Sequence, residues 1–288
     1  MSLKVSSGPV DDEPMIISGE LIKAHSRYLS ALGRRPRTIE SRRTMLYRVQ
    51  HATGQSLTTI TREQLEDYLE SLTAPATKRV YLAHLRGFYR WAVDEQLITT
   101  DPTRRVVAPK IPKAVPRPMS EGDLSRALSD APPNVRAWMI LAAFGGLRAC
   151  EIALVRGEHV VRGATPYLIL PETKGGGAAT VPLADVVLAE LDRWPTTGPL
   201  WQASGPMHYQ VISRKVNAHL RSHDIRSGLH SLRHRFGTQA YISTGHDLRQ
   251  TQELMRHASP ATTAVYTQLD PRGGAAAVNR LPVPSSAA

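Results

Sequence analysis

The sequence predicts a mainly helical protein that carries one small antiparallel β-sheet and is divided into two domains. Three observations support this prediction. Apolar residues recur at helical spacing along most of the 288 residues. The period changes only near residues 159–183, where β-rich runs flank a glycine turn. A basic, proline-rich stretch at residues 104–118 separates two patterned regions.

The first region, residues 15–103, is expected to form an all-helical domain. Its four helical patterns cover Ser18–Leu32, Thr38–Thr53, a segment that begins at Thr61, and Ala74–Asp94. Gly33 and Gly54 follow the first two patterns and are typical helix stops. Thr61 and Gln64 have the spacing of a capping box, in which the Thr hydroxyl accepts an amide proton and the Gln side chain reaches back.

Residues 104–118 are expected to form an extended linker between the domains. Four prolines lie between residues 109 and 118, and their fixed φ and missing amide proton oppose both helix and central strand. From Arg104 to Arg117 there are five basic residues and no acidic one. A solvated surface loop fits this composition equally well.

The second region, residues 119–270, is expected to combine helices with the small sheet. Ser120 is a typical helix start, and Val135–Gly146 is apolar enough to be a buried helix. The β-rich runs lie near His159–Val161, in Pro166–Pro171 and in Ala178–Leu183, which predicts a hairpin or a three-stranded sheet. Helical patterning then returns from Leu183 to about Leu269, and residues 271–288 form a tail.

The charge balance favours a polyanionic partner, and double-stranded DNA is the first candidate. Lys and Arg number 36 against 25 Asp and Glu, so the formal net charge is +11. Two basic clusters and the linker supply the side chains expected to contact phosphates, positioning the protein without reading the sequence. These are Arg34, Arg35, Arg42, Arg43, Lys78, Arg79, Arg86, Arg104, Arg105, Lys110 and Lys113.

Several other classes of protein are excluded. The single cysteine, Cys150, cannot form an internal disulfide or a cysteine-based zinc finger. The longest apolar run, Trp138–Leu147, is too short to span a membrane, and the N-terminus lacks the apolar stretch of a secretory signal. We therefore expect a cytoplasmic protein. His230 and His234 lie one helical turn apart, but no Cys or carboxylate stands at ligand spacing, so we expect neither a metal nor a cofactor.

Six residues carry the chemistry in a fixed order. Arg148 lies in Gly-Leu-Arg-Ala-Cys-Glu, Lys174 in Thr-Lys-Gly, His230 and Arg233 in His-Ser-Leu-Arg, and His257 nine residues before Tyr266. Each residue taken singly is more often a surface, capping or core residue. In this order, on a basic chain with two domains, they make the sequence resemble the tyrosine recombinase (phage integrase) family over about residues 18–270.

The resemblance implies a four-helix, SAM-like core-binding domain followed by a catalytic domain. It also implies that Tyr266 attacks a DNA phosphodiester, forms a 3′-phosphotyrosine and releases a 5′-hydroxyl. Lys174 would protonate the leaving oxygen, His230 would accept or shuttle the tyrosine proton, and His257 would form a hydrogen bond with a phosphate oxygen. Arg148 and Arg233 would clamp the phosphate, and Glu151 would orient its neighbours.

These residue types suit that reaction for physical reasons. A phenol has a pKa near 10, so its proton must be removed during attack at neutral pH. The pentavalent transition state gathers negative charge, which planar guanidinium groups stabilise with paired hydrogen bonds. Two positions depart from the family's usual pattern. Arg256 stands where glycine is common, and we expect it to reach a neighbouring phosphate or a partner subunit. Ser231 stands where an acidic residue is common.

Few residues precede the first predicted helix, so the chain resembles compact recombinases without an arm-binding domain. The expected function is integration of a phage or mobile element at DNA attachment sites, by a tetramer in which residues 271–288 dock on a neighbouring protomer. A directionality factor is a further candidate partner. The alternatives are a Xer-like chromosome-dimer recombinase, a type IB topoisomerase and a non-catalytic DNA-binding regulator.

Overall fold

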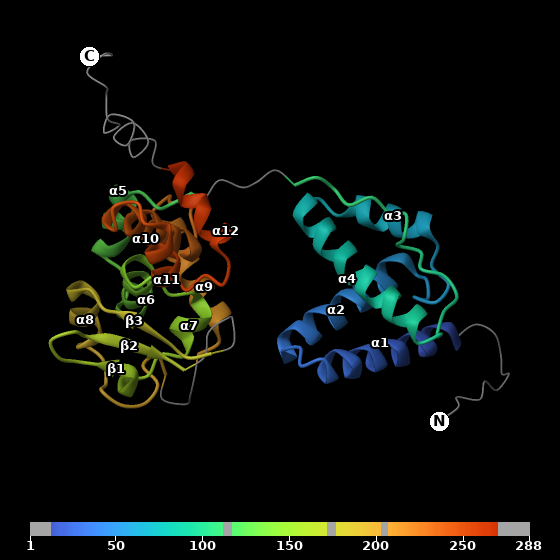
Figure 1. Ribbon diagram of the computed structural model, residues 1–288, viewed down its shortest axis with the longest axis horizontal. Coiled ribbons are helices and arrows are strands. Elements are labelled where there is room, and N and C mark those ends of the chain that lie inside the picture. The colour runs from blue at the N-terminus through green and yellow to red at the C-terminus, as the bar shows by residue number, and fades with distance from the viewer. Residues whose placement is uncertain (1–12, 112–116, 172–176, 203–206, 270–288) are drawn as a thin grey trace, which may run out of the picture. The chain divides into compact units, whose positions relative to one another are not determined.

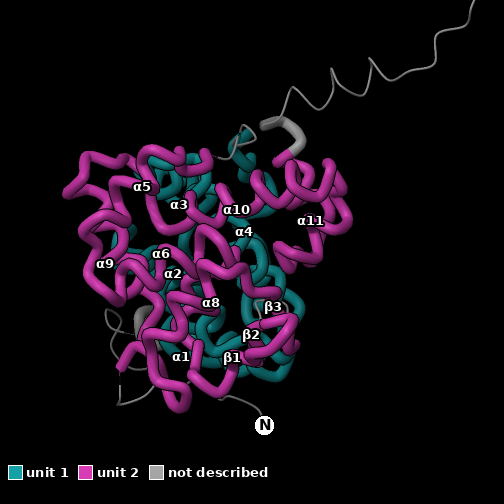
Figure 2. Tube along the Cα trace, turned by 90° about the vertical axis from the view of Figure 1, so that its left-hand side faces the viewer, with its two compact units in different colours: residues 1–113 teal, residues 114–288 magenta. Residues whose placement is uncertain are grey.

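The structure is a computed structural model that describes residues 13–111, 117–171, 177–202 and 207–269 (Figure 1). The chain divides into two compact units, residues 1–113 and residues 114–288 (Figure 2). The described residues form helices and one three-stranded antiparallel sheet, which confirms the predicted fold class.

Unit 1 is built from four helices, α1 (Glu13–Ala31), α2 (Pro36–Thr53), α3 (Arg62–Ser71) and α4 (Pro75–Asp94). The predicted capping box is confirmed at the start of α3. The Gln64 amide donates to Thr61 Oγ1 at 3.3 Å, and the Thr61 amide donates to Gln64 Oε1 at 2.9 Å. α4 contacts each of the other three helices, so its apolar face forms the centre of the unit.

The core of unit 1 contains a histidine among aromatic rings. His25, on α1, is 2% exposed. Its ring centroid lies 5.2 Å from that of Phe88 and 5.0 Å from that of Trp91, both on α4. Burial lowers the pKa of His25 to about 4, and the positive charge of Arg42 acts in the same direction. The imidazole is therefore neutral at physiological pH.

The first residues of the predicted linker pack on unit 1. Val106 is buried and joins the hydrophobic core of this unit, and Thr103, immediately before the predicted linker, is fully buried. Arg86 donates to the carbonyl oxygen of Val106 at 2.5 Å, which fastens the segment to α4. Lys113 lies outside the described residues, and the linker role of the remaining residues stays a prediction.

Unit 2 surrounds an apolar helix. Its α-helices are α5 (Glu121–Ser129), α6 (Pro133–Phe144), α7 (Ala149–Ala153), α8 (Asp185–Leu191), α9 (Tyr209–Ser222), α10 (Leu229–Ser243), α11 (Leu248–Met255) and α12 (Pro260–Thr263). Two 3₁₀ helices, η1 (Gly157–His159) and η2 (Ala264–Leu269), complete the helical elements described. α6 is buried almost all round, as its continuous apolar sequence predicts, and α7, α8, α9 and α10 all contact it.

The sheet has the strand order β1 (Val160–Val161), β2 (Tyr167–Leu170), β3 (Ala179–Pro182). Val160 lies opposite Leu168, and Leu168 lies opposite Val181, so the buried face runs across all three strands. This arrangement confirms the predicted three-stranded sheet. Residues 172–176, which lie between β2 and β3 in the sequence and include Lys174, are outside the described residues.

The burial of His25 makes the stability of unit 1 depend on pH. Between its ordinary pKa of 6.5 and its folded pKa of about 4, the unfolded chain binds a proton that the folded chain does not. The free energy of unfolding of unit 1 therefore falls as the pH falls through this window. His25→Phe removes the titrating group and keeps an aromatic ring in the core. The free energy of unfolding of the variant should therefore fall less over this pH window than that of the unaltered protein. Hydrogen exchange of α4 amides from pH 4 to pH 7 measures the difference, and parallel curves for the two proteins would contradict the prediction.

Candidate active site

A glycine turn positions Arg148 and Glu151. Gly146 has φ +60°, and a Cβ there would lie 2.3 Å from Cδ1 of Phe236, so only glycine fits. The turn ends at Arg148, the N-cap residue of α7. Glu151 is 1% exposed, and it accepts hydrogen bonds from the Arg148 amide at 2.8 Å and from Arg148 Nη1 at 2.6 Å. The carboxylate thus holds both the backbone and the side chain of Arg148.

Arg233 reaches the same place from α10. It is 2% exposed, and its guanidinium donates to the carbonyl oxygens of Gly146 and Met255. Its Nη1 lies 3.9 Å from Oε2 of Glu151. Burial lowers the pKa of Arg233 to about 9, and the charges of Arg148 and Arg256 act in the same direction. The guanidinium still carries its charge at neutral pH.

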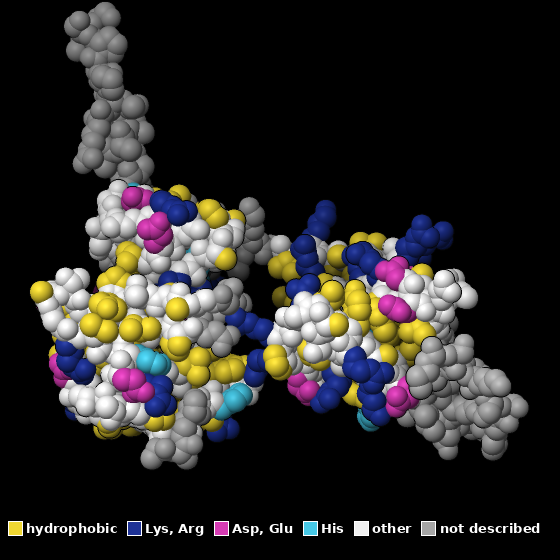
Figure 3. Space-filling view, turned by 60° about the horizontal axis from the view of Figure 1, so that its bottom comes forward, with side chains coloured by type: hydrophobic (Ala, Val, Ile, Leu, Met, Phe, Trp, Pro, Cys, Tyr) yellow, Lys and Arg dark blue, Asp and Glu magenta, His cyan; other side chains and the backbone are white. Residues whose placement is uncertain are grey.

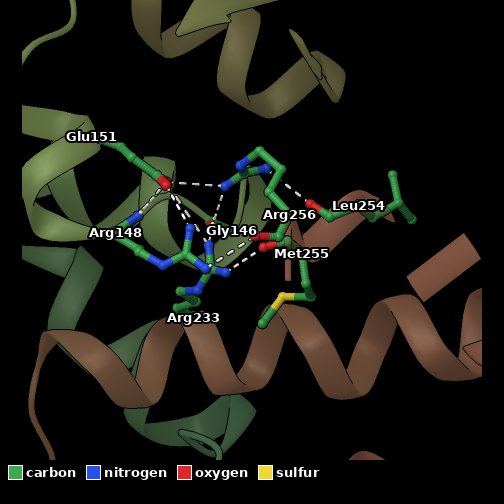
Figure 4. Close-up of polar contacts among 7 residues, drawn as sticks. All are labelled: Gly146, Arg148, Glu151, Arg233, Leu254, Met255 and Arg256. Carbon is green, nitrogen blue, oxygen red and sulfur yellow. Dashed lines mark hydrogen bonds and ion pairs between the residues drawn. The ribbon is translucent and has the colours of Figure 1, made fainter. Parts of the chain in front are cut away.

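Arg256 adds a third guanidinium to this cluster. It follows α11, and its Nη2 donates to the Gly146 carbonyl at 2.7 Å and to Glu151 Oε2 at 3.2 Å. The side chain is 8% exposed. The expectation that Arg256 reaches a neighbouring phosphate or a partner subunit is therefore wrong for this structure, because the guanidinium turns inward to a buried carboxylate (Figure 4).

The four charged side chains leave an excess of positive charge. Burial would raise the pKa of Glu151, but Arg256, Arg148 and Arg233 outweigh burial and hold that pKa below its ordinary value. The carboxylate is therefore ionised, and one negative charge faces three positive ones. An arrangement of this kind can bind an anion such as a phosphodiester.

His257 and Tyr266 lie beside this cluster. His257 Nδ1 is 3.0 Å from Oγ1 of Thr263. Burial lowers the pKa of His257 to about 4, helped by the charges of Arg233, Arg148 and Arg256. The ring of Tyr266 is nearly parallel to that of His257, at an angle of 9° and with 6.4 Å between centroids. Both side chains therefore belong to the same site as the arginines.

Tyr266 lies on η2, and its side chain is buried against α10. Its exposed fraction is 1%, and a Cβ at Gly237 would lie 2.3 Å from Cζ of its ring, so the absence of a side chain at residue 237 makes the contact possible. Burial raises the pKa of Tyr266 to about 12, although Arg233 and Arg148 act in the opposite direction. The phenol therefore holds its proton at neutral pH and needs an acceptor before it can attack.

His234 is a neighbour of Tyr266 that sequence reasoning missed. Its Nδ1 lies 3.4 Å from the Tyr266 hydroxyl. Burial lowers the pKa of His234 to about 4, as do the nearby His230 and Arg233, so the imidazole is neutral and can accept a proton. The ring of His230 lies 4.5 Å from that of His234, between centroids. The one-turn spacing of the two histidines indicates that they share a helix face, but on its own it does not place that face against Tyr266.

The structure thus brings together Arg148, Glu151, Arg233, His257 and Tyr266, with His230 adjoining them through His234. Lys174 lies outside the described residues. Ser231 donates to the Gly228 carbonyl at 2.7 Å, within the first turn of α10.

One group of potential metal ligands exists among the described residues, outside this site. Ligand atoms of Asp130, His219 and His223 lie within 4.8 Å of one another. His219 Nε2 is 2.7 Å from the Ala127 carbonyl, and His223 Nε2 is 2.9 Å from Oδ1 of Asp130. These contacts join the end of α5 to the end of α9, which accounts for the cluster without a metal.

Some of the basic side chains of unit 1 that are predicted to contact DNA are exposed, and others are partly buried or bound to other groups of the protein. Arg34, Arg35, Arg43, Arg79, Arg104, Arg105 and Lys110 are exposed, and Lys and Arg side chains project from the surface (Figure 3). Lys78 donates to the Glu70 carbonyl at 3.1 Å, Arg86 holds Val106, and Nε of Arg42 is buried. The contacts of all these residues with DNA stay predictions.

No helix in the described ranges is both long and apolar enough to cross a membrane.

Comparison with known proteins identifies relatives. Residues 123–272 match the model of the phage integrase family. Tyrosine recombinase XerD of Caulobacter vibrioides is 30% identical over 236 residues, which cover 72% of this chain and 76% of the relative. Tyrosine recombinase XerC of Escherichia coli O6:K15:H31 is 29% identical over 66% of this chain and 68% of its own length.

Solved structures share the fold. A lambda integrase dimer bound to a COC′ core site matches with a TM-score of 0.71 and 18% identity, covering 86% of this chain and 76% of that one. XerH recombinase bound to a palindromic difH substrate matches with a TM-score of 0.66 and 20% identity, covering 91% and 84%.

The family match spans just over half of the chain, and the relative from Caulobacter aligns with most of it. The chain therefore belongs to the phage integrase family of tyrosine recombinases, enzymes that cleave and rejoin DNA at specific sites.

Proposed function

We propose that this recombinase integrates a phage or mobile element at double-stranded DNA attachment sites, with Tyr266 as its nucleophile. The observation that carries the nucleophile assignment is the position of Tyr266. Its hydroxyl lies 3.4 Å from a neutral imidazole, and the charges of buried Arg233 and half-buried Arg148 oppose the effect of burial on its pKa. A phenol beside both a proton acceptor and an anion site can attack a bound phosphodiester.

The proposed first step is attack by the phenol oxygen on the scissile phosphorus. Arg148 and Arg233 donate to the non-bridging oxygens, whose negative charge grows in the pentavalent transition state. Glu151 holds Arg148 by its backbone and its side chain during this step. His257 donates to a phosphate oxygen, as the resemblance implies.

Two proton transfers accompany the attack. The phenol proton passes to an imidazole, and His234 is placed for this by its contact with the hydroxyl, with His230 next to it. Lys174 gives a proton to the leaving 5′-oxygen. The bond between phosphorus and that oxygen breaks, and the phosphotyrosine retains a phosphodiester linkage. A second 5′-hydroxyl can then attack the phosphotyrosine, so the cycle consumes no ATP and the scheme uses no metal or cofactor.

Strand exchange between two duplexes needs four active sites, so we propose a tetramer on DNA. A lambda integrase tetramer bound to a Holliday junction matches this chain with a TM-score of 0.69 and 18% identity. The exposed basic residues of unit 1 would contact phosphates, and residues 271–288, which lie outside the described residues, would dock on a neighbouring protomer. We place the reaction in the bacterial cytoplasm, with a directionality factor as a further partner.

A second candidate is a Xer-like role in resolving chromosome dimers. It is favoured by the relatives reported above, which are XerD and XerC recombinases. Both roles use the same chemistry, so they differ in the DNA site. Mapping trapped covalent adducts in the host separates them: adducts beside the gene of this chain support integration, and adducts at a site that resolves dimers support the second role.

Tyr266→Phe should abolish covalent attachment to DNA and leave the affinity for a half-site within about threefold, because only the nucleophilic oxygen is lost. A nicked suicide substrate traps the adduct for gel analysis. Recovery of an adduct with the Phe variant would overturn the assignment.

His234→Phe should slow adduct formation by at least about tenfold, because a positioned proton acceptor contributes about 10²–10⁴ in rate. His230→Phe is the matched control on the same helix face. Single-turnover rates measured from pH 5 to pH 9 identify the acceptor. If only the His230 variant is impaired, the proton goes to His230 as the resemblance implies, and the role of His234 is rejected.

Lys174→Ala should slow cleavage of ordinary DNA much more than cleavage of DNA whose 5′-bridging oxygen is replaced by sulfur. A thiolate leaves without a proton, so the general acid becomes dispensable. The measurement is the ratio of the two cleavage rates in the variant and in the unaltered protein. An unchanged ratio would show that Lys174 is not the acid.

A further inference from the structure

Arg256 has a backbone conformation that ordinarily favours glycine. It ends α11 with φ +52° and ψ +48°, in the left-handed region that side chains with a Cβ disfavour. Its amide still donates to the carbonyls of Gln252 and Glu253, so the turn is a regular helix end. A non-glycine residue persists in such a place when the contacts of its side chain compensate.

Those contacts connect Arg256 to every other member of the charged cluster. Nη2 donates both to Glu151 and to the Gly146 carbonyl, which also accepts from Arg233. Nη1 donates to the Leu254 carbonyl at 2.8 Å. The backbone oxygen of Arg256 in turn accepts from Arg148 Nη2 at 3.2 Å. Figure 4 shows the three guanidinium groups converging on the single carboxylate.

The guanidinium of Arg256 is placed to act through Glu151 and not on a ligand directly. Its side chain is 8% exposed and its Nε is fully buried, whereas Arg148 is 19% exposed. Without Arg256, the charge of Glu151 would be shared by Arg148 and Arg233 alone, leaving one net positive charge. With Arg256 the cluster carries two. Arg256 is also the strongest of the charges that oppose burial in setting the pKa of Glu151.

We propose that Arg256 is a positioning residue for the strand-transfer reaction: it binds the Glu151 carboxylate and so leaves Arg148 and Arg233 with more positive charge toward the scissile phosphate. The inference rests on the proposed function, because it assumes that these two arginines hold the phosphate. It assigns to Arg256 an electrostatic effect that a purely structural side chain would not have.

The experiment compares two nicked half-sites that differ only at the scissile linkage. One carries an ordinary phosphodiester, and the other a methylphosphonate, in which an uncharged methyl group replaces one non-bridging oxygen. Arg256→Gln should slow single-turnover adduct formation on the phosphodiester by at least about tenfold, as expected for lost stabilisation of transition-state charge. On the methylphosphonate the loss should be below about threefold, because less charge develops there. Arg256→Lys, which keeps the charge, should recover part of the rate on the phosphodiester.

Two further variants separate charge from folding. Arg256→Gly relieves the left-handed backbone and removes the guanidinium, so it should show the same dependence on substrate as Arg256→Gln. Arg136→Gln is the control, because Arg136 binds another buried carboxylate of unit 2, Glu190, at 3.1 Å. It should affect both substrates equally.

The outcomes distinguish the inference from the function on which it rests. If the unaltered protein forms an adduct and both Arg256→Gln and Arg256→Gly slow the two substrates by the same factor, Arg256 is only structural and the inference is overturned. If the unaltered protein forms no adduct with either substrate, the proposed function fails, and the inference fails with it. A loss confined to the charged substrate supports both.

Discussion

The buried carboxylate of Glu151 is the constraint on which the rest of the candidate site depends. Three guanidinium groups from α7, α10 and the end of α11 approach it, and each is partly or wholly removed from water. Cations so placed repel one another, and an uncompensated buried charge destabilises a fold by about 3–5 kcal/mol. Glu151 therefore does more than orient one arginine. It allows α7, α10 and α11 to meet with their positive side chains facing one another.

Close packing of the backbone complements this electrostatic constraint. Gly146 and Gly237 are positions where a Cβ would collide with an aromatic ring, that of Phe236 in one case and that of Tyr266 in the other. The first glycine brings a carbonyl within reach of two arginines, and the second lets the phenol pack closely against α10. The site is thus compact because two side chains are absent, and its carbonyl groups satisfy guanidinium donors that one carboxylate cannot satisfy alone.

The sequence predicted the elements well because their signals are local. The capping box at Thr61, the apolar helix α6 and the three strands follow from residues near one another in the chain. It did not predict that His234 lies against Tyr266 or that Arg256 turns inward, because these contacts join residues 32 and 105 positions apart. A cation at residue 256, where glycine is common in the family, led to the expectation of a contact with a neighbouring phosphate or a partner subunit. No local pattern reveals that the buried carboxylate of Glu151 binds this guanidinium instead.

The positive charge of the arginines has two effects in the proposed chemistry. It attracts the phosphate, and it lowers the pKa of the neighbouring imidazoles. Burial is the main reason that His234 and His257 have pKa values of about 4, but Arg233 lowers both further. In the absence of DNA the charges of the arginines therefore help to keep these imidazoles neutral. In the proposed mechanism, a phosphodiester binds between Arg148 and Arg233, and its negative charge partly cancels the effect of the arginines on the imidazoles. The pKa of a neighbouring imidazole then rises, and the imidazole becomes a stronger proton acceptor. The same negative charge also raises the pKa of Tyr266, because it opposes the effect of Arg233 and Arg148 on the phenol, so the proposed proton transfer to the imidazole takes place during the attack and not before it.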